Sequence, residues 1–480
     1  MSRGTFEVQA TTTRPKITVT ADGAGVVSHA GTRLLADLAE ATTLTAELSS
    51  ALHGVRGPRP RHDPGRVLVD LAVAIADGAE TISDIAVLAD QTALFGAVAS
   101  DSTCWRLLDA LDGYALGRIA AARARARALA WAQRAETTGR AFARSRVAGS
   151  AGLDTLVIDV DAHVLVCHSE KEQTAPTFKH TFGYHPLLAF CDNTGEFLAA
   201  LLRPGNAGSN TAADHIAVLD TALEQVPDAY RHGHPILVRA DGAGCTKAFL
   251  AHLRSLRDTG VSCEFSVGWT ITGREHAAIA LLRARDWTAA VDTEGELRPV
   301  EEAAVAEITA LLPAATLAAY PTGTRVIVRR ERPHPGAQLD LIEQADGYRY
   351  TALATDTRVG QHAFLDARHR AHARVEDRIR TGRATGLRRL PSREFAINHA
   401  WLTTTMIAVD LLCFAQTILL HDTALARVEP KTLRYRLLHA AARLTRGQRR
   451  LWLRIDQHWP WARDLAAAFT RLAALPVPAG

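Results

Sequence analysis

Apolar residues recur at helical spacing through most of the first 150 residues, and this pattern predicts a helical N-terminal region. The first helix is expected between Gly31 and Leu52. Asp63 follows a Pro/Gly/Arg-rich link and stands directly before Pro64, which is typical of a helix start. A long Ala/Arg-rich helix is expected to end near Arg134, whereas the polar, Thr-rich residues before about position 22 predict a short extended lead or strand.

The period of the apolar residues changes at Leu153, where segments rich in β-branched residues begin to alternate with helical ones. The run DTLVIDVDAHVLVCH predicts a first strand, and the runs YHPLLAFCD and EFLAALLRPG predict a hairpin with its turn at Asn193–Gly195. Two further strands are expected at PILVRAD and CEFSVGW, each next to a helical segment. Strands and helices in this order predict an α/β core.

Residues 271–356 have a different pattern, with four strand-like runs (WTAAVDTE, RVIVRRERP, QLDLIEQ and YRYTALATD) and one expected helix near 300–312. Beyond Val359 the patterns are all helical, including a basic helix that is expected from Lys431. The most apolar stretch, 401–420, contains Asp410 and several threonines, so it predicts a buried core helix and not a membrane span.

The composition is that of a soluble globular protein, and 480 residues exceed one ordinary core. The six cysteines form no CxxC pair and the N-terminus lacks an apolar signal segment, which together predict a cytoplasmic protein. Positive charge concentrates between positions 361 and 460, where 18 Arg or Lys against 8 Asp or Glu give a net +10, compared with +4 for the whole chain. This part of the chain is therefore expected to bind a polyanion, with a solvated basic helix face as the alternative.

Acidic residues stand at two notable places in the expected strands. Asp159 and Asp161 lie two apart on the first strand, so both side chains point to one face of the sheet. Asp241 ends a later strand before a Gly-rich turn, where ligands gather in open α/β sheets, although it would also suit the N-cap of the next helix. A carboxylate in an apolar strand requires compensation by an arginine or by a bound cation, and the sequence leaves both open.

A third acid, Glu376, lies in the basic helical segment HRAHARVEDRIR. Helical spacing places His369, His372, Glu376 and Arg383 on one face, and a surface salt bridge is the alternative role for the Glu. Three carboxylates in this order suit two Mg²⁺ or Mn²⁺ ions, which prefer oxygen ligands. Two such ions can activate a water or a 3′-hydroxyl and stabilise the leaving oxygen of a phosphodiester displacement.

The chain resembles the DDE transposases of bacterial insertion sequences, in the cut-and-paste group with a β-rich insertion between the second Asp and the Glu. That group carries the signature Y-x2-R-x3-E-x6-K around its Glu, and the same spacing here is His369-x2-His372-x3-Glu376-x6-Arg383. Arg383 keeps a phosphate-binding cation, whereas the histidines give a weaker, pH-dependent positive charge. The resemblance extends over about 150–440, in the segments LVIDVDA, HSEKE, LLRPGNAGSN, VRADGAG, RVIVRRERPHPGAQLDL, DGYRYTALATDT and GLRRLPSREFAINHAWL.

The resemblance implies that Asp161, Asp241 and Glu376 are the catalytic metal ligands, with Asp161 favoured over its neighbour Asp159. It also implies that His369, His372 and Arg383 contact DNA phosphates.

Relatives in the group hold a flipped base with an aromatic residue of the insertion, for which Trp269 and Trp287 are the candidates, with a place in the hydrophobic core as the alternative for each. Arg330 and Arg332 share one face of an expected strand, which is either a DNA-facing surface or a solvated edge.

The expected fold is mixed α/β, with an RNase H-like catalytic core at 151–270 and 357–425 and a β-rich insertion at 271–356. A helical N-terminal region (1–150) is expected to bind the terminal repeats, and a helical basic C-terminal region (426–480) follows the core.

The expected function is DNA transposition. It comprises binding of terminal inverted repeats and target DNA by a nucleoid-associated homodimer, followed by metal-dependent cleavage and strand transfer. The alternatives are a two-metal DNA nuclease of the same fold without strand transfer, and a catalytically decayed DNA-binding relative.

Overall fold

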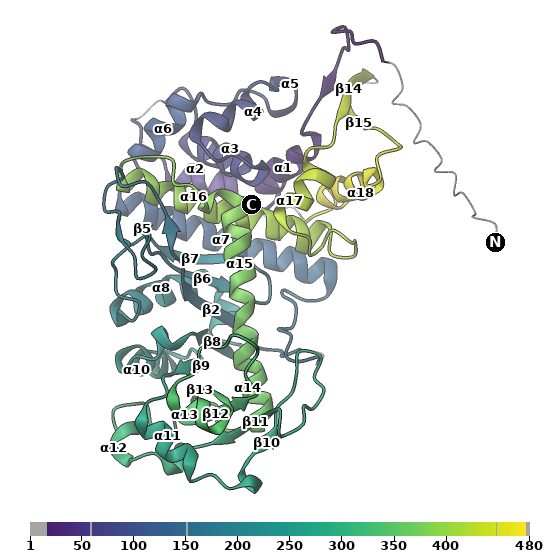
Figure 1. Cartoon of the computed structure of the whole chain (residues 1–480). Helices are drawn as coiled ribbons and strands as arrows, with labels where there is room; N and C mark the ends of the chain where they lie inside the picture. Colours follow the sequence, from purple (N-terminus) through teal and green to yellow (C-terminus); the bar gives the residue numbers. More distant parts are fainter. Residues whose placement is uncertain (1–16, 58–59, 150–151, 448, 477–480) are drawn as a thin grey trace, which may run out of the picture.

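A mixed sheet of nine strands forms the centre of the computed structural model, which describes residues 17–57, 60–149, 152–447 and 449–476 (Figure 1). The strand order is β10-β11-β12-β13-β9-β8-β2-β6-β7. The bounds are β2 (Leu156–Ala162), β6 (Leu187–Cys191), β7 (Phe197–Leu201), β8 (Ile236–Ala240), β9 (Cys263–Trp269), β10 (Thr288–Ala289), β11 (Ala303–Glu307), β12 (Arg325–Glu331) and β13 (Arg349–Thr355). Strands β2, β6 and β7 are antiparallel, and β8 and β9 follow parallel to β2. This arrangement confirms the predicted RNase H-like core.

The two faces of the sheet are covered by different helices. Leu156, Ile158 and Val160 of β2 lie in the core formed with α8 (Ala212–Glu224) and α10 (Lys247–Ser255). Because side chains alternate along a strand, Asp159 and Asp161 point to the opposite face. There β2 contacts α15 (Val375–Gly382), which follows α14 (His362–Arg370) in a nearly continuous column (Figure 1).

Strands of the insertion extend the catalytic sheet. β13 pairs antiparallel with β9, so the insertion begins and ends beside the same core strand. The helix expected near 300–312 is wrong, because Ala303–Glu307 forms β11 and pairs with β12 along its whole length. Local helix propensity is overridden there by pairing with a neighbouring strand. The reverse holds at the expected strand QLDLIEQ, where the Asp340 side chain caps the short helix α13 (Leu341–Asp346).

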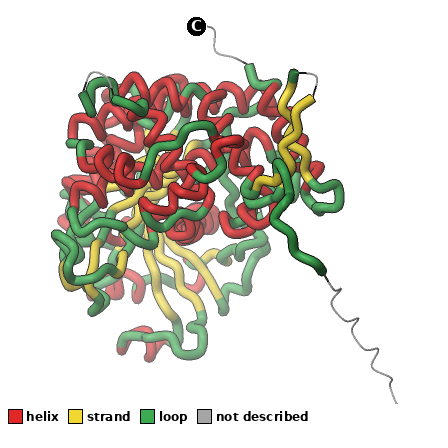
Figure 2. The backbone as a smooth tube through the Cα atoms, turned by 90° about the horizontal axis from the view of Figure 1, so that it is seen from above, coloured by secondary structure: helices red, strands yellow, loops and turns green. Residues whose placement is uncertain are grey.

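The predicted N-terminal helices form a layer above one end of the sheet (Figures 1 and 2). The Asp63 side chain accepts a hydrogen bond from the Arg66 backbone N–H at 2.7 Å, which confirms the predicted helix start. The helices are α1 (Arg33–Ala41), α2 (Leu44–Ala51), α3 (Pro64–Asp77), α4 (Ala86–Ala89), α5 (Thr92–Phe95), α6 (Asp101–Asp109) and α7 (Gly113–Thr138). They share one hydrophobic core with α16 (Phe395–Phe414) and α18 (Ala462–Ala473), so this region does not have a separate core of its own.

The long apolar helix is part of this shared core. The segment Phe395–Leu419 is long and apolar enough to cross a membrane, but 89% of its most apolar window is buried inside the protein. The prediction of a buried core helix is therefore confirmed.

The sequence pattern predicted a C-terminal region that is helical throughout, and this prediction is wrong. Helical structure from α17 (Pro430–Leu433) ends at Leu438, and β14 (Ala442–Gly447) and β15 (Arg450–Ile455) then form an antiparallel hairpin. The short strand β1 (Val26–Val27) pairs with β14 and lies beyond the lead expected before about position 22, whose described residues 17–22 form no strand and whose residues 1–16 lie outside the described part. The hairpin forms because alternate residues are apolar and pack against the helices.

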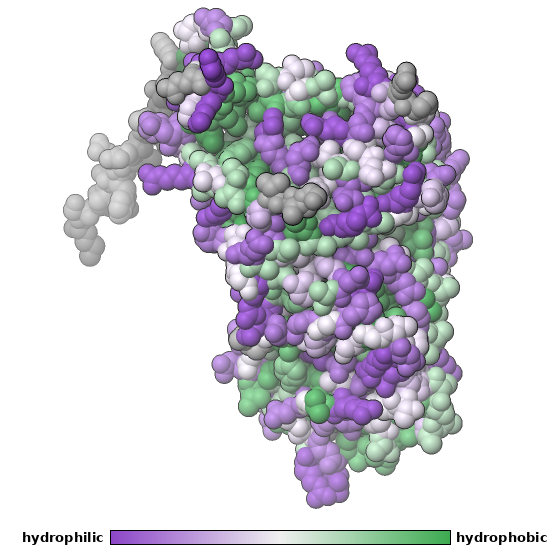
Figure 3. Space-filling model, turned by 180° about the vertical axis from the view of Figure 1, so that it is seen from behind, coloured by the Kyte–Doolittle hydropathy of each residue, from purple (hydrophilic) through white to green (hydrophobic). Residues whose placement is uncertain are grey.

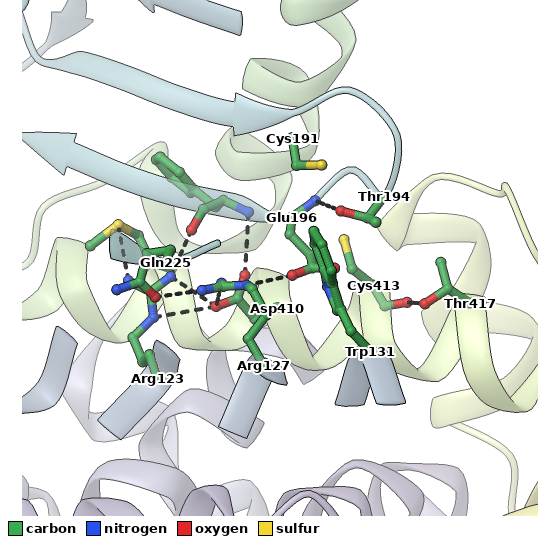
Figure 4. A network of polar contacts seen from close by, with 12 residues as sticks. Arg123, Arg127, Trp131, Cys191, Thr194, Glu196, Gln225, Asp410, Cys413 and Thr417 are labelled. Atoms are coloured by element: carbon green, nitrogen blue, oxygen red, sulfur yellow. Dashed lines mark hydrogen bonds and ion pairs between the residues drawn. The ribbon is translucent and has the colours of Figure 1, made fainter. Parts of the chain in front are cut away.

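A buried network of charged side chains joins the helical layer to the sheet (Figure 4). Asp410 on α16 accepts hydrogen bonds from Arg123 Nη2 at 2.8 Å and from Arg127 Nη2 at 2.6 Å, both on α7. Arg127 also donates to Glu196, which precedes β7 and accepts from Trp131 Nε1 at 2.9 Å. Each of these charges is almost fully excluded from water, so each depends on its partners.

Replacing Asp410 with alanine is expected to lower the free energy of unfolding by about 3–5 kcal/mol, because two buried guanidinium groups lose a carboxylate. Urea denaturation would measure this change. The matched control is Asp422→Ala, which breaks an exposed pair with Arg471 and is expected to cost less than about 1 kcal/mol. Equal losses in the two variants would contradict the structural importance of the network.

A second polar cluster fixes the base of the hairpin. His29 Nδ1 and His439 Nε2 lie 2.6 Å and 3.2 Å from the two carboxylate oxygens of Asp77, which ends α3. Burial alone would raise the pKa of Asp77, but hydrogen bonds from His29, His439 and Thr32 lower it to about 2. Conversely, the hydrogen bond to Asp77 raises the pKa of His439, against the opposing effects of burial and of Arg434.

These shifts predict a pH-dependent contribution to stability. The part due to Asp77 is present above its unfolded pKa near 4 and is lost as the pH falls through about 2. The part due to His439 is complete below about pH 6.5 and is lost as the pH rises through its raised folded pKa. Urea unfolding of the His439→Asn variant should therefore differ most from the wild type at about pH 5–6 and least at alkaline pH. A constant difference across this range, or the same trend in the exposed-site control His458→Asn, would contradict the assignment.

Candidate active site

The two aspartates of β2 have different surroundings. Asp159 is 1% exposed and forms a two-pronged ion pair with Arg239 of β8, with both N–O distances at 2.7 Å. His372 Nδ1 lies 2.8 Å from the same carboxylate. Burial would raise the pKa of Asp159, but Arg239 and His372 hold it well below its usual range. Asp159 therefore has its charge balanced by protein groups.

Asp161 lies two residues further along β2 and is half-buried, with no ion-pair partner among the described residues. Its Oδ1 accepts only the neighbouring Ala162 backbone N–H, at 2.8 Å. Burial raises the pKa of Asp161 to about 6, and the negative charges of Asp241 and Glu376 add to this against the opposing charge of His372. The three acids predicted from the sequence lie near one another, because Val160 of β2 pairs with Ala240 of β8, just before Asp161 and Asp241, and α15 contacts β2.

Asp241 and Glu376 reach this point from different elements. Asp241 follows β8 and caps a single 3-10 turn, Gly242–Gly244, by accepting the Ala243 N–H at 2.9 Å. A Cβ on Gly268 of β9 would lie 2.7 Å from the Gly242 nitrogen, so glycine at position 268 lets this turn lie close to the strand. Glu376 lies in the first turn of α15, and both acids are exposed.

These three carboxylates fit a divalent cation site. They have no ion-pair partner in the described part of the chain, and burial, with a further contribution from the charges of Asp241 and Glu376, raises the pKa of Asp161. Oxygen donors of this kind are the preferred ligands of Mg²⁺ and Mn²⁺. A bound cation would relieve the repulsion, whereas Arg239 already compensates Asp159.

The histidines of the predicted signature face the sheet. His369 Nδ1 lies 3.1 Å from the Ser266 hydroxyl of β9, and burial lowers its pKa to about 3, so the ring is neutral. His372 contacts Asp159, and its Nε2 is buried without a hydrogen-bond partner in the described structure. A DNA-facing role for the two residues stays a prediction, and these inward positions do not favour it.

Arg383, the last residue of the signature spacing, lies at the end of α15 and is exposed. The helical column is interrupted just beyond it, because Gly386 adopts a positive φ of 86° and its carbonyl accepts the Trp401 Nε1–H at 2.9 Å. A cleft of about 300 Å³ opens at this interruption. Its basic lining residues are Arg380, Arg383, Arg388, Arg389, Lys431 and Arg434, against the acids Glu80 and Glu429.

The other predicted DNA-binding residues occupy two different environments, since Arg330, Arg332 and Trp287 lie in the insertion whereas Trp269 ends the core strand β9. Arg330 of β12 and Arg332, which follows the strand, stack on Tyr348 at 4.8 Å and 4.2 Å, and the Trp287 ring lies 4.2 Å from the Arg330 guanidinium. Trp269 is 9% exposed and donates to Glu275 at 3.2 Å, so its indole is mostly enclosed. The structure brings Trp287 and the two arginines together, while the roles of all four residues toward DNA stay predictions.

Arg239, Asp192 and Arg374 are the functional neighbours that sequence reasoning did not find. Arg374 Nη2 lies 2.5 Å from Asp192 in the β6–β7 turn, and Asp192 lies 3.4 Å from Arg239, so the chain of charges continues to Asp159. The signal was present in PILVRAD, where an arginine interrupts an apolar strand. The partner of this arginine could not be inferred from the sequence, because only the pairing of β2 with β8 places Arg239 beside Asp159.

Two sequence segments that resembled the transposase group contact each other. Lys171 of HSEKE donates from Nζ to the carbonyls of Leu390 and Ser392, at 2.6 Å and 2.7 Å. Both acceptors belong to GLRRLPSREFAINHAWL, and the Glu172 carboxylate accepts the Phe395 N–H of that segment at 2.8 Å. The contacts fix the start of α16 beside the interruption after α15.

Comparisons with known proteins identify the class of protein. A family model described as "Transposase DDE domain group 1" matches residues 9–477, so the chain belongs to this family of DDE transposases and acts in DNA transposition. No curated protein matches the chain. Among solved structures the chain is similar to the piggyBac transposase in a synaptic complex with hairpin DNA, with 8% identity and a TM-score of 0.45. That match covers 85% of this chain and 80% of the other.

The contrast between the two aspartates predicts opposite effects of the same substitution. Asp159→Asn should lower the free energy of unfolding by roughly 3 kcal/mol, because a buried guanidinium loses its two-pronged partner. Asp161→Asn should leave stability unchanged or raise it, because a half-buried carboxylate in a repulsive cluster is removed, and should abolish DNA cleavage. Urea denaturation without divalent metal and a cleavage assay measure both effects. The reverse order of stabilities would make Asp159 the better candidate ligand.

Proposed function

We propose that the protein binds the terminal inverted repeats of a transposable element, cuts the DNA at its ends in a metal-dependent reaction and joins them to target DNA. The observation that supports this most directly is the convergence of Asp161, Asp241 and Glu376 beside an already compensated Asp159. Membership in the DDE transposase family agrees with this chemistry.

The three acids are proposed to hold two Mg²⁺ or Mn²⁺ ions. When bound, such ions lower the pKa of an attacking water or 3′-hydroxyl and neutralise charge on the phosphate and the leaving oxygen. Asp161 and Asp241 would hold them at the ends of adjacent parallel strands, and Glu376 would complete the set from α15. The Asp159–Arg239–His372 group is proposed to position these ligands by fixing β2 and the α14–α15 column.

Basic side chains beyond the end of α15 and in the insertion are proposed to bind the DNA backbone. Within the described structure Arg383, Arg388 and Lys431 have no ion-pair partner, although they line the cleft beyond α15. Guanidinium and ammonium groups free of carboxylates are available to phosphates. The Arg330–Trp287–Tyr348 stack offers a second surface at the insertion, where a base or a phosphate could rest.

We also propose that the protein acts as a homodimer on DNA, in which each chain cuts one end of the element and the two ends are joined to target DNA together. The helical layer of residues 30–138 is proposed to contribute to recognition of the repeats, with the shared core placing it firmly beside the catalytic sheet. Action on cellular DNA implies a cytoplasmic, nucleoid-associated protein.

The Glu376→Gln variant should bind a terminal-repeat duplex as tightly as the wild type but lose at least about 1,000-fold in Mg²⁺-dependent cleavage, because an amide is a poor ligand for the ions. Gel assays of nicks, double-strand breaks and strand-transfer products on a plasmid with both repeats measure this. Glu394→Gln is the control, since Glu394 is an exposed acid at the start of α16 with no proposed catalytic role. Cleavage by Glu376→Gln at the wild-type rate would refute the catalytic assignment.

The same assay separates the proposal from its alternatives. Nicks and breaks without any joined product would identify a nuclease of the same fold. Binding of the repeats without cleavage in either metal would identify a decayed DNA-binding relative, in which the histidine replacements at 369 and 372 are the first substitutions to reverse.

A further inference from the structure

The β14–β15 hairpin presents two faces of opposite character. Cross-strand partners share a face, and the pairs Leu444–Leu453 and Ala442–Ile455 point toward the helical layer, where the hairpin residues pack against the hydrophobic core. The pairs Arg443–Arg454, Thr445–Trp452 and Gly447–Arg450 form the other face. We call these outward residues, Arg443, Arg450, Trp452 and Arg454, the arm face.

The arm face carries positive charge that nothing in the described chain neutralises. Arg443 and Arg454 are exposed and directly opposite each other, and like charges in this position destabilise a sheet. The five described arginines between 442 and 455 have no ion pair within the described residues, and this stretch of the sequence has no acidic residue. An arrangement that is unfavourable in the free protein becomes favourable beside a polyanion.

An aromatic ring completes this surface. Trp452 is 43% exposed, and the Arg454 guanidinium lies 5.9 Å from the centre of its ring. The Nε of Arg454 donates a hydrogen bond to the Thr445 hydroxyl. The hairpin lies at the end of the molecule opposite the insertion (Figure 1), in a part of the surface where hydrophilic and apolar residues are both exposed (Figure 3). It is held at its base by β1 and by the His29–Asp77–His439 cluster, so its orientation is fixed.

We propose that the β14–β15 hairpin is a DNA-binding arm that grips duplex DNA at a distance from the cleavage site. A two-stranded ribbon fits the width of the major groove, and outward arginines would contact phosphates on its two sides. This inference rests on the proposed transposition, since the duplex would be the part of the element held while its end is cut. The arm would supply affinity, while the carboxylates at the sheet perform the reaction.

The test compares the triple variant Arg443→Gln/Arg450→Gln/Arg454→Gln with Arg140→Gln/Arg144→Gln/Arg146→Gln, which removes the same charge from three exposed arginines elsewhere. Fluorescence anisotropy with a labelled terminal-repeat duplex should show at least a tenfold loss of affinity in the arm variant. The slope of log affinity against log salt should fall by roughly 2–3, one for each lost phosphate contact. The control should change affinity less than about threefold.

Two further measurements show whether a loss of DNA binding in the arm variant comes from a folding defect or from a loss of catalysis. Urea denaturation should show the arm variant to be no less stable than the wild type, because the opposed Arg443–Arg454 pair is relieved. At saturating protein the arm variant should cut the duplex at the wild-type rate, whereas Glu376→Gln should bind and not cut.

Equal duplex affinity and salt slope in the arm variant and the wild type would overturn the arm, even if transposition is confirmed. The arm would equally be refuted if the variant lost binding only to anionic lipid vesicles. Loss of duplex binding in the variant, in a protein that never cuts DNA, would support the arm while refuting the proposed catalysis.

Discussion

The buried ion pair between Asp159 and Arg239 is the interaction on which the rest of the candidate active site depends. A guanidinium inside a sheet is stable only when its partners are in place, so the pair requires β2 and β8 to keep a single register. Its outer partners, His372 and Asp192, extend the requirement to the α14–α15 column and to the β6–β7 turn. Glu376 comes from 135 residues beyond Asp241, and this set of charges helps to hold its helix against the sheet.

The contrast between Asp159 and Asp161 also explains why the first ligand could not be chosen from the sequence. Period 2 placed both carboxylates on one face, and the structure agrees. The two aspartates differ because only Asp159 has an arginine beside it. That arginine, Arg239, comes from β8, which pairs with β2 from about 80 residues further along the chain. One acid is paired with cationic groups of the protein, while the other has no ion-pair partner among the described residues.

Most of the core strands and the order of the acids could be predicted, because alternation, turn residues and helix caps act over short distances. The hairpin at β6–β7 and the cap at Asp63 are of this kind. Expectations failed at β11, at α13 and at β14–β15, where short segments take their structure from a neighbouring strand or a local cap. The inward direction of His369 and His372 was equally hidden, since helical spacing gives a shared face without saying what that face contacts.

The pairing of β13 with β9 has a consequence for how such a protein can change over evolution. The chain leaves the core after β9 and returns on the adjacent strand, so everything between them grows outward from two neighbouring points. Segments there could lengthen, shorten or acquire new loops while the entry to α14 stays where it is. Diversification of the insertion and conservation of the sheet beside it are therefore compatible within one continuous sheet, without a hinge or a separate module.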